Sequence, residues 1–81
     1  MDIKENVKKF IQSELVTDRK FADLQDKDPL ISTGIIDSLG IMRLTAFLEK
    51  SFAVRIHDEE IIAENFGTVE SISALIQKKL P

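Results

Sequence analysis

The sequence contains no cysteine and only one histidine, His57, among its 81 residues. Without cysteine there are no disulfides, thiolate nucleophiles or cysteine metal ligands, and a single histidine provides no pair for a zinc site or for acid–base chemistry. The three glycines, Gly34, Gly40 and Gly67, are too scattered to form a phosphate-binding loop. We therefore expect neither catalytic residues nor a metal site in this chain.

Long apolar runs and an excess of positive charge are also absent. No window approaches the roughly 18 apolar residues of a membrane-spanning helix, and residues 1–5 contain no basic segment that leads into an apolar run. The formal net charge of −3 disfavours binding to phosphate backbones and to anionic membranes. We expect a cytoplasmic protein without a membrane span that binds no nucleic acid.

The residues that are present are typical of one small folded domain. Apolar residues make up 43% of the chain and charged residues 31%, a balance that favours a globular fold over disorder. A chain of this length hides only about 60% of the surface that its unfolded form exposes, so a deep internal active site is not expected. We predict a single monomeric domain over residues 1–81.

The spacing of apolar residues predicts three long helices and one short helix. The long helices are expected at residues 2–15, beginning at Asp2, at residues 38–51, and after Thr68 to the C-terminus; the short one is expected at about residues 58–65. Apolar stripes run along the long helices at Ile3, Val7, Phe10 and Ile11, at Ile41, Leu44, Leu48 and Phe52, and at Val69, Ile72, Leu75, Ile76 and Leu80. Stripes of this kind share one core, so we predict an all-α fold, a small four-helix bundle.

Two segments connect these helices. Residues 16–36 form a long, turn-rich loop between the first two helices, in which residues 21–24 are expected to form a short helical turn. Residues 52–56 alternate like a strand, but without a partner strand we interpret them as an extended linker anchored by Val54 and Ile56. The apolar residues expected to pin the long loop to the core are Phe21, Leu24, Leu30, Ile31, Ile35 and Ile36.

Ser38 is the candidate functional residue, because it lies where the long loop gives way to the second helix. Either Asp37 or Ser38 fits the N-cap of that helix. A serine nucleophile needs an adjacent base, and His57 lies beyond a helix of some 14 residues, roughly 20 Å away. Modification of Ser38 by another enzyme is the remaining functional interpretation. A phosphodiester attached there is stabilised by about 0.3–1 kcal/mol, because its negative charge lies beside the positive end of the helix dipole. Gly34 and Gly40 are expected to keep the approach to the hydroxyl open.

The pattern Gly-x-x-Asp-Ser-Leu at residues 34–39 resembles the acyl carrier protein family, which includes peptidyl and aminoacyl carrier domains. The resemblance extends over nearly the whole chain, including Phe-Gly-Thr-Val at residues 66–69. It implies that a phosphopantetheinyl transferase attaches a 4′-phosphopantetheine arm from coenzyme A to Ser38. It also implies that the arm carries an acyl or aminoacyl group as a thioester, and that Asp37 and Leu39 help partners to dock. Such a protein is a substrate of loading enzymes and of downstream acyltransferases or synthases, and is not itself an enzyme.

The second helix departs from the pattern of fatty-acid-synthesis carriers, which resemble this chain but have a strongly acidic second helix. Here Arg43 and Lys50 are basic, and Glu49 is the only acid after Asp37. A basic helix repels cationic docking patches, so a specialised lipid, polyketide or amino-acid-activating pathway is favoured. Two alternatives remain: a housekeeping fatty-acid carrier, and an unmodified helical adaptor in which Ser38 is only a cap.

Four residues of the second helix are expected to select partners. Three are apolar, and one of them, Met42, fits a core position equally well. The expected partner face consists of Leu39, Met42, Arg43 and Ala46.

Overall fold

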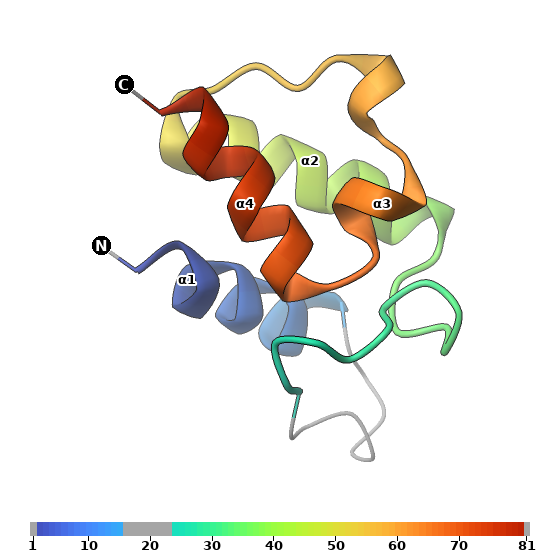
Figure 1. Ribbon diagram of the computed structural model, residues 1–81. Helices are drawn as coiled ribbons and strands as arrows, with labels where there is room; N and C mark the ends of the chain where they lie inside the picture. Colours follow the sequence, from blue (N-terminus) through green and yellow to red (C-terminus); the bar gives the residue numbers. More distant parts are fainter. Residues whose placement is uncertain (1, 16–23, 81) are drawn as a thin grey trace.

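The computed structural model describes residues 2–15 and 24–80, and every regular element within these ranges is helical. The first helical run consists of α1 (Ile3–Phe10) and a π-helical continuation, η1 (Ile11–Leu15). The other long helices are α2 (Ser38–Phe52) and α4 (Val69–Lys79), and the short ones are the 3₁₀-helix η3 (Asp58–Glu60) and α3 (Ala63–Phe66) (Figure 1). The predicted all-α fold with three long helices is confirmed.

The first helical run begins as predicted and ends with a wider winding. The Asp2 carboxylate accepts a hydrogen bond from the Glu5 N–H at 3.4 Å, which caps α1. Further along, the Ser13 hydroxyl donates to the Lys9 carbonyl at 2.8 Å. In a regular α-helix that carbonyl accepts from the Ser13 N–H, so the side chain competes with the backbone for it. The predicted helix over residues 2–15 is therefore correct in extent, but its last five residues are π-helical.

The core lies between α1, α2 and α4. α4 packs against both α1 and α3, and stacked rings of Phe10 and Phe47, with centroids 4.2 Å apart, join α1 to α2. Ile41 and Leu80 are only partly buried at the edge of this core. The long helices contribute the following buried side chains: Val7, Leu44, Leu48, Phe52, Val69, Ile72, Leu75 and Ile76.

The described part of the long loop is tied to the junction of α3 and α4. The Leu30 N–H donates to the Gly67 carbonyl at 2.7 Å, and the Glu70 N–H donates to the Asp26 carbonyl at 3.0 Å. Ile31 is 38% exposed, so its predicted role as an anchor is wrong: its carbonyl accepts from the Gly34 N–H in a turn that carries the side chain outward. Phe21 and the turn predicted at 21–24 lie outside the described residues, apart from Leu24. The anchors confirmed as buried are Leu24, Leu30, Ile35 and Ile36.

The segment between α2 and α4 contains one confirmed and one corrected element. Residues 54–57 have no helix or strand, and Ile56 is buried and Val54 partly buried, as predicted for the anchors of a linker. The linker begins two residues later than the predicted residue 52, because Phe52 ends α2 and Ala53 has a left-handed backbone (φ 54°). The single helix predicted at about 58–65 is wrong, because η3 and α3 are separate and Ile61 between them has a non-helical backbone (φ −86°, ψ 74°). The partly buried Ile61 packs against the core, which turns the chain at this point. His57 occupies the position before η3, and its N–H donates to the Glu60 carboxylate at 2.9 Å.

Candidate attachment site at the start of α2

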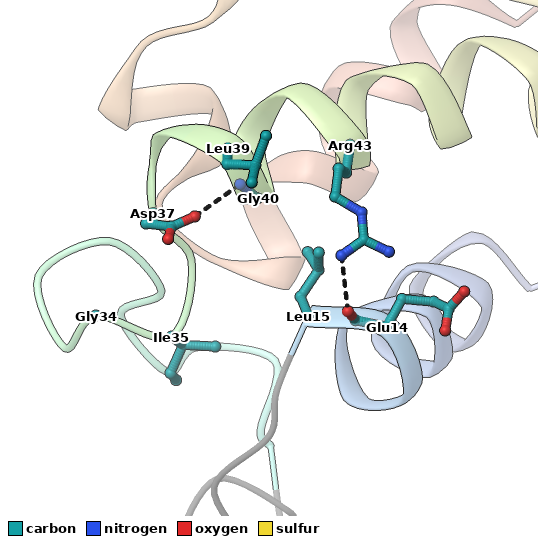
Figure 2. Close-up of a pocket in the computed structure, with 8 residues that line it drawn as sticks. All are labelled: Glu14, Leu15, Gly34, Ile35, Asp37, Leu39, Gly40 and Arg43. Atoms are coloured by element: carbon teal, nitrogen blue, oxygen red, sulfur yellow. Dashed lines mark hydrogen bonds between the residues drawn. The ribbon is translucent and has the colours of Figure 1, made fainter.

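Asp37, not Ser38, is the N-cap of α2. Its Oδ1 accepts a hydrogen bond from the Gly40 N–H at 2.7 Å (Figure 2), and its backbone is extended, as expected for a cap. Ser38 is the first residue of the helix, and its side chain is exposed. Within residues 2–15 and 24–80 the Ser38 hydroxyl has no hydrogen-bond partner. Asp37 therefore caps the helix, and the hydroxyl of Ser38 is left exposed.

The two glycines near Ser38 differ in their surroundings. Gly34 has a φ of +79°, which disfavours any residue with a side chain, and a Cβ added there meets no described atom within 4 Å. Gly40 is buried, and a Cβ added there lies 3.1 Å from Ile36 Cγ2 and 3.2 Å from Asp37 Oδ1. The space around Gly34 is open, and its effect on the approach to Ser38 stays a prediction, whereas Gly40 lets Ile36 and the capping carboxylate pack closely against the helix.

A surface pocket of about 330 Å³ lies beside the first turn of α2 (Figure 2). Its walls come from the end of the first helical run, from Gly34 and Ile35 of the loop, and from Asp37, Leu39, Gly40 and Arg43 of the second helix and its cap. The two carboxylates of Glu14 and Asp37 and the guanidinium of Arg43 give it a mixed charge. It is an open hollow that adjoins the capped end of α2.

Arg43 joins α2 to the end of the first helical run. Its Nη1 donates to the Glu14 main-chain carbonyl at 3.1 Å, a contact that Figure 2 shows across the pocket. The sequence gives no signal of this contact, because 29 residues separate the two partners and no local pattern connects them. Arg43 therefore has a structural role in addition to the predicted role in partner selection.

The four residues predicted to select partners are all exposed on α2. Leu39 and Met42 are 65% and 69% exposed, which excludes Met42 from the core. Ala46 lies one helical turn beyond Met42, so the three apolar residues form a short outward stripe. What this stripe binds stays a prediction.

The described part of the chain contains neither a membrane span nor a cluster of metal ligands. None of its helices is long and apolar enough to cross a membrane. Nor do three or more His, Cys, Asp or Glu side chains gather there in a way that could hold a metal ion.

An exposed serine at the start of a long helix, directly after a capping aspartate in a small helical domain, is typical of a carrier protein. Comparison with known families agrees: residues 13–76 match the family described as "Phosphopantetheine attachment site". The chain belongs to this family of carrier proteins, which are substrates of modifying enzymes and are not catalysts.

Two curated relatives are similar to most of the chain. The chain is 40% identical over 55 residues to "Probable acyl carrier protein PigG" of Serratia sp., an alignment that covers 68% of this chain but only 63% of that relative. It is 31% identical over 72 residues to the D-alanyl carrier protein of Streptococcus suis, covering 89% of this chain and 87% of that protein. Both relatives are described as carriers.

Solved structures share the fold. A chain in a crystal structure of a FAD-dependent dehydrogenase superposes with a TM-score of 0.74 at 34% identity, covering 86% of this chain and 97% of that one. A chain in the crystal structure of the Bradyrhizobium japonicum glycine:carrier protein ligase complexed with glycylated carrier protein superposes with a TM-score of 0.71 at 26% identity. That match covers 91% of this chain and 99% of the other.

Proposed function

We propose that Ser38 is the residue to which 4′-phosphopantetheine is attached. The observation that carries this proposal is the exposed Ser38 hydroxyl, which has no hydrogen-bond partner among the described residues while Asp37 caps the helix. Ser38 also lies within the matched residues 13–76. A phosphodiester on Ser38 would lie beside the free N–H groups of the first helical turn, where negative charge gains about 0.3–1 kcal/mol.

The attachment is carried out by a phosphopantetheinyl transferase with coenzyme A as donor. The Ser38 oxygen forms the new bond to phosphorus, the bond from phosphorus to the 3′,5′-ADP part of coenzyme A breaks, and the hydroxyl proton passes to a base of the transferase. The attached arm supplies the thiol that this cysteine-free chain lacks, and the thiol holds cargo as a thioester.

We further propose that the cargo is a small aminoacyl group of a specialised pathway. Two similar proteins are described with such cargo, a D-alanyl carrier protein and a glycylated carrier protein. A loading ligase attaches the amino acid, and a downstream acyltransferase or synthase removes it, in the cytoplasm where coenzyme A is available. Arg43 and Lys50 on α2 argue against docking to the cationic patches expected of housekeeping fatty-acid enzymes.

Modification in vitro tests the attachment. We expect incubation with coenzyme A and a broad-specificity transferase to add one phosphopantetheinyl group, detected by intact mass measurement. Ser38→Ala should abolish the addition, whereas Ser32→Ala, at an exposed serine in the loop, should leave it unchanged. If a known carrier is modified under the same conditions and this protein is not, the adaptor alternative is favoured instead.

The cargo is tested on the protein purified from its own cells. Hydroxylamine cleaves a thioester and releases the acyl group as its hydroxamate, which mass spectrometry identifies. We expect an amino-acid hydroxamate. A long-chain fatty hydroxamate would contradict the proposed cargo but would leave the role of Ser38 intact.

A further inference from the structure

The outward face of α2 is apolar at its centre. Leu39 and Met42 are the two most exposed large apolar side chains of the described residues, at 65% and 69%. Ala46 continues the stripe by one turn. A cluster of this kind on one helix, next to the candidate attachment site, indicates a protein-binding surface.

The charges beside this stripe are positive, although the whole chain has a net charge of −3. Arg43 and Lys50 are exposed and lie seven residues apart, on one side of the stripe. In residues 2–15 and 24–80 no carboxylate pairs with either cation, and Arg43 donates instead to the Glu14 main-chain carbonyl. Lys50 therefore presents an uncompensated positive charge, and the exposed Arg43 adds a second one beside its bond to Glu14.

The acidic residues of α2 and its cap are engaged within the protein. The Asp37 carboxylate accepts from the Gly40 N–H at 2.7 Å, and the half-buried Glu49 accepts from the Ile56 N–H at 2.9 Å. These hydrogen bonds tie both carboxylates to the backbone of this chain, although Asp37 lines the same pocket as Arg43. The docking face consequently has an apolar centre and one cationic edge.

We infer that this face fits a partner protein with an apolar cleft bordered on one edge by carboxylates. The inference takes from the proposed function only the premise that α2 meets the enzymes that load and unload the arm. The carboxylates would pair with Arg43 and Lys50 at the edge, where charge pairs mainly set specificity and association rate. Arg43 also lines the pocket that contains Glu14 and Asp37, so we expect the partner's carboxylates to approach Arg43 from the stripe and not through that pocket.

Two synthetic helical peptides test this chemistry on the unmodified protein. Both carry the same Leu and Phe face, flanked by glutamates in one peptide and by lysines in the other. Binding is followed by titration into ¹⁵N-labelled protein and by the shifts of its backbone amide signals. We expect the glutamate peptide to shift the signals of Leu39, Met42 and Ala46, with a Kd at least ten-fold lower than that of the lysine peptide.

Charge reversal provides the matched comparison. Arg43→Glu combined with Lys50→Glu should reverse the preference between the peptides. Lys9→Glu combined with Lys78→Glu, which makes the same change in net charge at exposed sites on α1 and α4, should leave it unchanged. Lys50→Glu alone has no described contact to lose and should shift the preference in the same direction.

The inference is overturned if both peptides bind equally, if neither shifts the α2 signals, or if the α1 and α4 variant changes the preference as strongly as the α2 variant. Because the protein carries no arm in these titrations, their outcome is independent of whether Ser38 is modified.

Discussion

Substitution of Asp37 and Ser38, one at a time, separates helix capping from arm attachment. Asp37→Ala removes the acceptor that lies 2.7 Å from the Gly40 N–H, and Gly40 is buried, so the amide has poor access to water. Loss of an N-cap lowers the free energy of unfolding by about 0.5–2 kcal/mol. Because the Gly40 N–H is buried, we expect a loss of about 1–2 kcal/mol for Asp37→Ala. For a domain of this size we expect Tm to fall by about 4–16 °C.

Ser38→Ala should change the free energy of unfolding by no more than about 0.5 kcal/mol, because the hydroxyl has no partner in the described part of the chain. Asp37→Asn keeps an acceptor at the cap and should recover most of the stability lost in Asp37→Ala. Urea unfolding followed by far-ultraviolet circular dichroism measures all three variants. If Ser38→Ala proves as destabilising as Asp37→Ala, the assignment of the cap to Asp37 is refuted.

Three further predictions concern the fold that supports the site. Leu48→Ala, at a fully buried side chain of α2, should cost about 2–5 kcal/mol in urea unfolding; a loss below about 1 kcal/mol would contradict the described core. Gly34→Ala should cost about 1–2 kcal/mol because its φ of +79° strains a residue with a Cβ, although the space is open; an unchanged Tm would contradict this backbone. The hydrogen bonds from Lys79 and from the His57 N–H lower the pKa of Glu60. The Glu60–Lys79 pair therefore stabilises the fold at a pH above the ordinary glutamate pKa of about 4.3, and this stabilisation is lost as the pH falls below that value. Lys79→Met should therefore weaken the loss of stability in acid, as measured by Tm between neutral pH and pH 3; an unchanged pH profile would contradict the pair.

The long helices could be predicted because their stability comes from apolar stripes with helical spacing, which the sequence displays directly. The stripe of α2 was predicted to include Leu44 and Leu48, and both are fully buried. The π-helical turn in η1 could not be predicted. It accompanies a hydrogen bond from the Ser13 hydroxyl to the Lys9 carbonyl, which the spacing of apolar residues does not reveal. The exposure of Ile31 likewise depends on a turn that ends at Gly34, and apolarity alone does not reveal it.

The candidate site could be predicted in position but not in its internal arrangement. Asp37 and Ser38 are both good capping residues, so local chemistry could not decide which one leaves its side chain free. The contact from Arg43 to the Glu14 carbonyl depends on how two distant helices pack, and no spacing pattern signals it. The residue pattern alone predicts a helix that starts at a hydroxyl-bearing residue. The attachment of a phosphopantetheine arm is implied only by the resemblance to carrier proteins.

Peptide mapping of the modified protein tests the central claim most directly. After treatment with coenzyme A and a transferase, tandem mass spectrometry of proteolytic peptides locates the phosphopantetheinyl group. We expect one group, on Ser38, in the peptide that contains Asp37 and Leu39. A group on any other serine, or a fully active transferase that leaves Ser38 unmodified, would contradict this expectation.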